Sequence, residues 1–343
     1  MLNWCVPQSC VVGVDLGGTN VRACAYSMDG HEAGVKFSNP SNARNGPEAV
    51  ADAVASTIHQ AANSCGAVVE AVGMGIPGHI DDARGLVRWA PNFLMVPGDS
   101  NAIWRDVPLK AMVEQRVGLP LHTGNDANVA ALGEYRFGSG RNTARCLVMI
   151  TLGTGVGGGV VLSPSAVHGK AGGPLVLLGG NKGGAELGHV CVDPVSAAFG
   201  PGARGSLESF CGAYGIVGRA AAKLAAGRQS ELLSSRFADD TLSTLAIFEA
   251  AGQDDLVALE VWKEVGEFLG LGLGSFINLF APDVLAVGGQ IAKASKFFMP
   301  SALVKTREVA IPTLMEDARI VTAEREEDAG LLGAAALALE ALR

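Results

Sequence analysis

The sequence predicts an α/β protein built from two related lobes with a cleft between them. Its 343 residues are enough for roughly two domains of about 150 residues each. Strand-like and helix-like hydrophobic patterns alternate along the chain. A unit of strand, glycine turn and strand at residues 11–27 is repeated at residues 147–162. The repeat indicates two similar halves, and we expect the chain to cross between them near Pro120.

The first half begins with two short strands, residues 11–14 and 21–27, joined by the turn Asp15–Asn20. Two strands joined so tightly predict a hairpin. The patterns that follow predict, in chain order, a helix at 47–64, a strand at 67–76 that ends at Pro77-Gly78, a helix at 109–117, a strand at 121–123 and a helix at 128–137.

The second half repeats the arrangement with strands at 146–152 and 158–162 around a Gly/Thr turn. Residues 206–280 have Leu and Val at three- and four-residue spacing, which predicts helices. A strand at 284–287 ends in Gly288-Gly289, and a helix from Asp328 onward closes the chain.

Glycine is the outlier of the composition. The chain has 46 glycines among 343 residues, whereas an average protein has about 7 %. They show no Gly-X-Y period and lie among Val, Leu and Ile, so they do not indicate collagen or a flexible linker. Because glycine lets a backbone approach another group closely, the excess indicates backbone brought near a ligand.

Charge and cysteine content narrow the class of protein. The net charge is −8 with no block of five like charges, which disfavours a nucleic-acid partner. Seven cysteines without a C-x-x-C pair favour reduced thiols and a cytoplasmic location. No positive residue precedes Arg22, so we expect no secretory signal. The longest apolar run, 146–162, contains five glycines, so we expect no membrane span.

Three segments match the G-x-G-x-x-G pattern of dinucleotide-binding proteins, but none has the surroundings this pattern needs. It requires a strand before it, a helix after it and an acidic residue about 20 residues further on. The match at Gly73–Gly78 meets Pro77, that at Gly153–Gly158 continues into a strand, and that at Gly200–Gly205 follows no clear strand. The P-loop pattern is absent as well, so a nicotinamide enzyme is disfavoured.

Two glycine turns fit a different kind of phosphate site. Gly17-Gly18-Thr19 and Gly153-Thr154-Gly155 each lie between strands, where glycine allows N–H groups to approach an anion and threonine adds a hydroxyl donor. Asp15, at the end of the first strand, is placed to hold a hydrated Mg²⁺ beside phosphates. Each turn alone could be an ordinary hairpin turn, but two copies in two halves favour a nucleotide clamp.

Several acidic and polar residues are candidates for catalysis or substrate binding. Asp126 lies between a strand and a helix, where it could cap the helix or accept the proton of an attacking hydroxyl. Glu186 and His189 are three residues apart; they could be surface residues, half of a metal site, or ligands of a polar substrate. Glu208 could simply be an acid at a helix N-terminus.

Together these residues resemble the ROK family of sugar kinases, within the actin-like ATPase superfamily. The matching stretches occur in the family's order and span nearly the whole chain: Asp15–Asn20, Gly75–Gly78, Ala90–Asn92, Gly124–Glu134, Leu152–Gly159, Gly184–His189 and Asn278–Gly289. The resemblance implies a two-lobed actin-like ATPase (ribonuclease H-like) fold with a mixed sheet in each lobe. It implies a smaller lobe of residues 1–122 plus 323–343, on which the last helix packs, and a larger lobe of 123–322.

The resemblance also implies roles for individual residues. Asp126 matches the catalytic base, and Asp15 the residue that holds Mg²⁺ with ATP. The nucleotide-binding positions implied are Asp15, Gly17, Gly18, Thr19, Gly153, Thr154, Gly155, Gly288 and Gly289. The sugar-binding positions implied are Asn92, Asn125, Asp126, Glu186, His189 and Glu208. Acids, amides and imidazole suit a hexose, because each can donate to or accept from a hydroxyl.

One segment departs from the family. Relatives commonly carry a zinc motif of the form C-x-C-G-x-x-G-C-x-E, and here Phe199, Pro201 and Ser206 stand at its three sulfur positions. Structural zinc needs four ligands, so the sequence predicts no zinc, although Cys191 and Cys211 lie nearby as alternative ligands. The segment 163–182 is also longer than usual beside the expected sugar site, which bears on substrate preference.

The resemblance therefore predicts ATP- and Mg²⁺-dependent phosphorylation of the 6-hydroxyl of a hexose, with glucose as the first candidate and Asp126 as general base. Fructose, mannose, N-acetylmannosamine or allose as acceptor stays open, and a polyphosphate donor is disfavoured because no Lys/Arg track is present. A catalytically silent sugar-binding regulator is the other class. A ROK repressor needs a DNA-binding domain before the first phosphate strand, which here starts at Val11. We expect a homodimer, as is common in the family.

Overall fold

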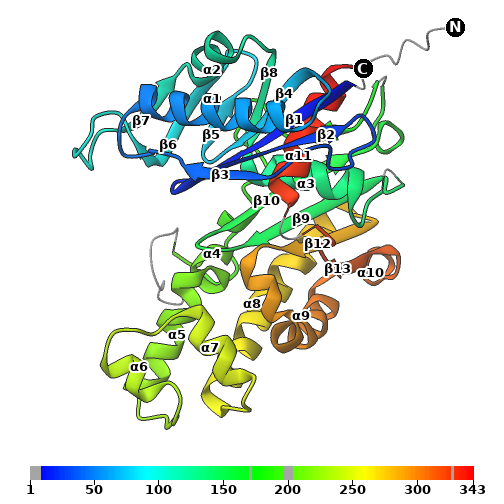
Figure 1. Ribbon diagram of the computed structural model, residues 1–343. Coiled ribbons are helices and arrows are strands. Elements are labelled where there is room, and N and C mark those ends of the chain that lie inside the picture. Colours follow the sequence, from blue (N-terminus) through cyan, green and yellow to red (C-terminus); the bar gives the residue numbers. More distant parts are fainter. Residues whose placement is uncertain (1–8, 142, 170–171, 196–203, 326–327) are drawn as a thin grey trace, which may run out of the picture. The chain divides into compact units, whose positions relative to one another are not determined.

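The computed structural model describes residues 9–141, 143–169, 172–195, 204–325 and 328–343. It divides into two compact units (Figure 1). The first comprises Met1–Thr143, Gly159–Ala185 and Glu327–Arg343, and the second Ala144–Gly158 and Glu186–Glu326. The expected lobes divide the chain at different places, because residues 123–143 and 159–185 make their contacts within the first unit. The lobe boundaries stay a prediction.

The first unit contains a five-stranded mixed sheet of order β3-β2-β1-β4-β8. Its strands are β1 (Ser9–Leu16), β2 (Asn20–Ser27), β3 (Phe37–Pro40), β4 (Val68–Ile76) and β8 (Leu121–Asn125). β1 and β2 pair antiparallel, which confirms the predicted hairpin, whereas β1, β4 and β8 run parallel. The carboxyl ends of these three parallel strands therefore lie along one edge of the sheet.

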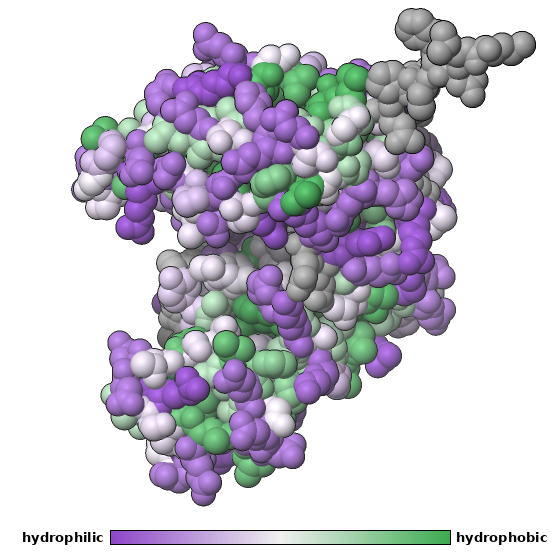
Figure 2. Space-filling view, in the orientation of Figure 1, coloured by the Kyte–Doolittle hydropathy of each residue, from purple (hydrophilic) through white to green (hydrophobic). Residues whose placement is uncertain are grey.

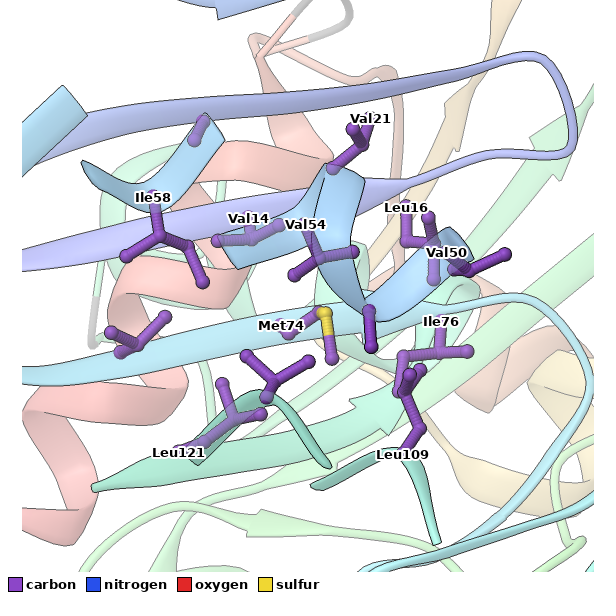
Figure 3. Close-up of a cluster of buried hydrophobic side chains, with 14 of the residues drawn as sticks. Val14, Leu16, Val21, Val50, Val54, Ile58, Met74, Ile76, Leu109 and Leu121 are labelled. Atoms are coloured by element: carbon purple, nitrogen blue, oxygen red, sulfur yellow. The ribbon is translucent and has the colours of Figure 1, made fainter. Parts of the chain in front are cut away.

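Helices cover both faces of this sheet. On one face, α1 (Pro47–Ser64) and α2 (Leu109–Val117) bury a large apolar cluster against β1, β2, β4 and β8. Figure 3 shows labelled side chains of this cluster from all six elements pointing into one volume. On the other face, α11 (Ala329–Ala341) packs against β1, β2 and β4 and lies beside α3 (Asp126–Phe137).

Glycines let α11 approach the sheet and α3 closely. A Cβ added at Gly13 would lie 2.2 Å from the Leu331 carbonyl oxygen, and one at Gly73 would lie 1.8 Å from that of Ala334. A Cβ at Gly333 of α11 would lie 1.9 Å from the Val129 carbonyl oxygen of α3. Part of the glycine excess therefore serves helix packing, which the composition alone did not indicate.

Two smaller β-structures complete the first unit. One is the antiparallel sheet of β5 (His79–Asp81), β6 (Leu86–Leu94) and β7 (Ile103–Val107), three strands that the hydrophobic patterns did not predict. In the other, the end of β10 (Val156–Leu162) pairs antiparallel with β11 (Leu175–Val176). β11, which lies in the segment 163–182, thus belongs to the first unit.

The second unit is built on β9 (Cys146–Leu152), which lies next to the start of β10 and pairs in parallel with β12 (Val284–Gly288). β12 pairs in turn with β13 (Arg319–Thr322), also in parallel. The helices are α4 (Leu207–Cys211), α5 (Ala213–Ala225), α6 (Ser234–Ala238), α7 (Thr244–Ala251), α8 (Leu256–Phe280), α9 (Ser295–Val309) and α10 (Pro312–Asp317). The helical prediction for 206–280 is confirmed.

A stripe of glycines at four-residue spacing brings α8 against α9. A Cβ at Gly266 would lie 2.1 Å from the Phe298 carbonyl oxygen, and one at Gly270 would lie 2.5 Å from that of Ala302. One turn further on, a Cβ at Gly274 would lie 2.7 Å from Val309 Cβ. Residues at i and i+4 share one helix face, so these glycines form a continuous contact surface.

The surface mixes polar and apolar side chains. On the face drawn in Figure 2, hydrophilic residues cover much of both units, with hydrophobic residues in small groups among them. None of the helices in the described part of the chain combines the length and the apolar character that a membrane span requires.

Candidate active site

Two of the predicted acids lie at the same edge of the first unit's sheet. Asp15 is near the carboxyl end of β1, and Asp126 directly follows β8, with β4 between these strands. The register pairs Asp15 with Gly75 and Gly75 with Gly124, and a Cβ at Gly75 would lie 3.5 Å from the Asp126 Cα. Ligands of open α/β sheets bind at the carboxyl ends of parallel strands, so this edge is the expected place for chemistry.

Asp15 is held by a partner that the sequence reading did not single out. Arg22 lies directly across the β1–β2 ladder, and its Nε donates to Asp15 Oδ2 at 3.2 Å, with a second contact from Nη2. The N-terminus of α11 is close as well, because a Cβ at Gly330 would lie 2.9 Å from Asp15 Cγ. The sequence alone could have predicted this contact, because a hairpin with its turn at residues 17–19 places positions 15 and 22 opposite each other.

The turn after Asp15 is tight and accessible. The Gly17 N–H donates to the Asn20 carbonyl at 2.8 Å, and Gly18 and Thr19 are exposed. Ser41 N–H donates to the Thr19 carbonyl at 2.9 Å, which anchors the turn. Asn92 of β6 is exposed beside it, because a Cβ at Gly18 would lie 3.5 Å from the Asn92 Cβ. The structure thus brings Asn92 to the first glycine turn.

Asn125 rather than Asp126 caps α3. The Asn125 Oδ1 accepts from the Ala127 and Asn128 N–H groups at 3.0 and 3.1 Å, and its Nδ2 donates to the Gly78 carbonyl at 3.0 Å. The alternative that Asp126 is simply the helix cap is therefore wrong. Asp126 is the first residue of the helix, half-buried, where the helix N-terminus favours negative charge.

The second glycine turn belongs to the second unit. It joins β9 to β10, with a hydrogen bond of 2.9 Å from Gly153 N–H to the Gly155 carbonyl, and Thr154 is exposed. A Cβ at Gly153 would have no neighbour within 4 Å, so its backbone faces open space. Gly289, at the end of β12, has φ +87° and packs on the end of β9: its Cβ would lie 2.3 Å from the Leu152 carbonyl oxygen.

Glu208 lies beside this second turn. Its Oε2 accepts from the Val156 N–H at 2.9 Å, and a Cβ at Gly155 would lie 2.3 Å from that oxygen. Ser206 caps α4 by accepting from the Ser209 N–H at 3.3 Å, which sets the start of the helix that carries Glu208. Glu208 is thus an acid in the first turn of a helix, which was one of the predictions for it. Its carboxylate, however, accepts a hydrogen bond from β10.

Glu186 and His189 belong to the same part of the second unit. Glu186 directly precedes a 3₁₀ turn at Leu187–His189 and His189 is its last residue, and both are exposed. The turn packs on β10, because a Cβ at Gly188 would lie 1.9 Å from the Val156 carbonyl oxygen. The chain after it pairs with the start of α4, with Leu207 N–H donating to the Val190 carbonyl at 2.9 Å. The predicted site residues therefore form two groups, one in each unit.

The cysteine-free segment is only partly described. Phe199 and Pro201 lie outside the described residues, whereas the Ser206 side chain is used as the α4 cap. Cys191 is exposed and Cys211 is buried. Within the described ranges, no group of three or more His, Cys, Asp or Glu side chains is placed to hold a metal ion. The absence of zinc stays a prediction.

Comparison with known proteins identifies the family. The family model described as "ROK family" matches residues 11–341. The chain belongs to the ROK family. This ROK protein is 33 % identical to a glucokinase of Thermotoga maritima over 336 residues, which is 98 % of this chain and 99 % of the relative. It is 25 % identical to the DNA-binding transcriptional repressor Mlc of Escherichia coli over 264 residues, 77 % of this chain and 59 % of that protein.

A solved structure agrees with the fold. The ROK family glucokinase from Streptomyces griseus, in complex with glucose and AMPPNP, matches with a TM-score of 0.76 and 33 % identity, covering 96 % of this chain and 99 % of that one. The α/β fold with mixed sheets that the ROK resemblance predicted is therefore confirmed. Sugar kinases are among the relatives of this ROK protein, and so is a repressor.

Proposed function

We propose that this ROK protein is a hexose kinase that transfers the γ-phosphoryl group of ATP to the 6-hydroxyl of glucose. The observation that carries the proposal is the placement of Asp126. It begins α3 at the carboxyl edge of the sheet that also carries Asp15. The similarity to glucokinases over nearly the whole chain supports the substrate.

Asp126 is the proposed general base. It is the first residue of α3, at the carboxyl edge of the sheet, and a positioned carboxylate can accept the proton of an attacking hydroxyl. Asn125 fixes the start of the helix by capping it and by bonding to Gly78. Phosphoryl transfer needs mainly positioning, charge neutralisation and a base. By fixing the start of α3, these bonds hold Asp126 in position to act as that base.

The residues fit Mg²⁺ and a nucleotide. Mg²⁺ prefers carboxylate oxygens and keeps several waters, and Asp15 offers a half-buried carboxylate oriented by Arg22. The turns at Gly17–Thr19 and Gly153–Gly155 would hold phosphates with backbone N–H groups, since the Gly153 side is open. Gly288 and Gly289 would lie against the nucleoside. When bound, ATP would supply the phosphoryl group and Mg²⁺ would offset its negative charge.

Sugar recognition is assigned to Asn92, Asn125, Glu186, His189 and Glu208. All five are exposed or half-buried, and their side chains can form a hydrogen bond with a hydroxyl as donor or acceptor. The Oε2 of Glu208 is bound to Val156 N–H, so Oε1 is the atom that we assign to a sugar hydroxyl. A site that bonds each hydroxyl rejects sugars that lack one, because its own polar groups would be left unpaired.

A coupled ADP-release assay across a panel of hexoses tests the proposal. Asp126→Asn should lower kcat by about 10²–10⁴-fold, the usual contribution of a general base, while calorimetry shows glucose binding retained. Asp29→Asn, an exposed acid in the turn after β2, is the matched control and should keep full activity. Turnover by Asp126→Asn at the normal rate would refute the assignment of the base.

A sugar-binding regulator without catalysis is the second candidate, favoured by the similarity to Mlc. The same panel separates the two functions. A regulator would bind a sugar in calorimetry but release no ADP with any hexose. A kinase for fructose, mannose, N-acetylmannosamine or allose would show the highest kcat/KM for that sugar instead of glucose.

A further inference from the structure

A small, partly open cavity is lined by residues of the first unit alone, among them residues in the first turns of α3. Its volume is about 70 Å³, whereas about 10–15 Å³ is enough for one water molecule. Its lining includes Val129 and Leu132 of α3 together with Val176 and Leu178 of the segment 175–182. Ile80 and Leu337 extend this apolar wall. The cavity has room for a molecule of several non-hydrogen atoms.

One polar atom in this apolar surface has no partner. Asn128 lines the cavity and is only 5 % exposed, and its Oδ1 is buried without a hydrogen-bond partner in the described structure. Leaving such an acceptor unsatisfied costs about 1–3 kcal/mol. Asparagine is also a weak helix former, and an apolar residue would pack here at no such cost. A hydrogen-bond donor on a molecule bound in the cavity would satisfy this oxygen.

The charges at the cavity cancel. Lys182 and Asp82 both line it, and Lys182 Nζ donates to Asp82 Oδ1 at 2.5 Å, with Asp81 Oδ1 3.8 Å away. The bond to Asp82 raises the pKa of Lys182, so the ammonium keeps its proton and its partner. A charged occupant would have to compete with this ion pair, which favours an uncharged molecule.

We propose that this cavity is a binding site for a small uncharged molecule with a branched aliphatic body and one hydroxyl or amide donor, which bonds to Asn128 Oδ1. The proposal does not rest on the hexose kinase function. A hexose does not suit it, because its ring of hydroxyls would face apolar side chains. Asn125 is the one proposed sugar-binding residue in the lining, so an occupant would contact the cap of the helix that begins with Asp126.

Methyl-detected NMR of the full chain with isobutyramide as the probe tests the site. The probe has a branched body and an N–H donor, and N,N-dimethylisobutyramide is the matched control without a donor. We expect saturable shifts of the Val129, Leu132 and Val176 methyl signals with isobutyramide, and at least tenfold weaker binding of the control. Equal binding of both amides, or no saturable shift, would overturn the proposal. A crystal soak that shows ordered water alone at Asn128 would do so as well.

Two variants locate the binding. Asn128→Leu removes the acceptor, and Leu178→Phe puts a larger side chain into the lining; each should weaken isobutyramide binding at least tenfold. Leu175→Phe, an exposed change on the same segment outside the lining, should leave it unchanged. Unchanged binding by Leu178→Phe would contradict the proposal even if Asn128→Leu did not fold. None of these readouts uses turnover, so the result is independent of the kinase assay.

Discussion

Arg22 and Asp15 face each other across β1 and β2, and the guanidinium holds one oxygen of the carboxylate. The side chains are 41 % and 21 % exposed, and pairs of this kind contribute about 1 kcal/mol or less to stability. The value of the pair therefore lies in orientation. With Oδ2 bound to Arg22, Oδ1 is the oxygen that we assign to Mg²⁺.

Arg22→Gln should impair nucleotide use while leaving the fold intact. We expect kcat/KM for MgATP to fall about tenfold, which corresponds to about 1.4 kcal/mol of lost positioning, with the KM for glucose unchanged. Titration of the protein with Mg-nucleotide by calorimetry should show the same loss without turnover. An unchanged nucleotide affinity would mean that the pair has no part in the site.

Substitution of two glycines of α11 by alanine should affect different properties, nucleotide use in one case and stability in the other. A Cβ at Gly330 would meet the Asp15 side chain, whereas one at Gly333 would lie 1.9 Å from a backbone oxygen of α3. Gly330→Ala should therefore displace Asp15 and lower kcat/KM for MgATP about tenfold. Its free energy of unfolding should change little, because alanine favours the helix.

Gly333→Ala should instead lower the free energy of unfolding by about 1–3 kcal/mol, since overpacked backbone contacts must separate. Urea denaturation of both variants measures the difference. The reverse order, with Gly330→Ala the less stable protein, would contradict the assignment of Gly330 to the site and of Gly333 to packing.

Local patterns predicted the parts of the fold that local forces determine. The hairpin around Gly17 was predictable because two β-runs flank a glycine turn, and the helices at 206–280 because their spacing is periodic. The sheet β5–β7 was not, because β6 carries Pro91 and polar Asn92 and depends on partner strands for its form. The helix α3 begins two residues earlier than the pattern predicted, because Asn125 caps it.

In the candidate site, too, local sequence predicts some features and tertiary contacts determine the others. Motif resemblance singled out Asp15, Asp126 and Glu208 as candidates, but it did not predict the contacts that orient their side chains. The bond from Asn125 to Gly78 joins residues 47 positions apart, and the one from Val156 N–H to Glu208 spans 52. Such pairs depend on the tertiary fold, so a local sequence pattern cannot predict them.

Two buried thiols should resist modification in the folded protein. Burial raises the pKa of Cys146 and of Cys211 to about 12, and the thiolate is the reactive form. Cys191, in contrast, is exposed. At pH 8 we expect iodoacetamide to modify Cys191 rapidly, and Cys146 and Cys211 only after denaturation, as measured by peptide mass spectrometry. Labelling of Cys211 as fast as that of Cys191 would show that α4 opens in the native state.

His122 should make stability fall in mild acid. Burial in β8, reinforced by the nearby Lys110 charge and opposed by Glu114, lowers the pKa of this imidazole from its ordinary 6.5. Below about pH 6.5 the unfolded chain takes up a proton that the folded chain resists, so the free energy of unfolding decreases until the lower folded pKa is passed. It should therefore drop less between pH 7.5 and 5.5 in His122→Gln than in the unmodified protein.

Urea denaturation at the two pH values measures this difference. His59→Gln, on the exposed side of α1, is the control for the loss of any histidine. Carboxylates titrate in all three proteins alike, so only the difference between variants reports on His122. A pH dependence of His122→Gln identical to that of the unmodified protein would show that the imidazole is hydrated in the folded state, and β8 would then be open to solvent at that residue.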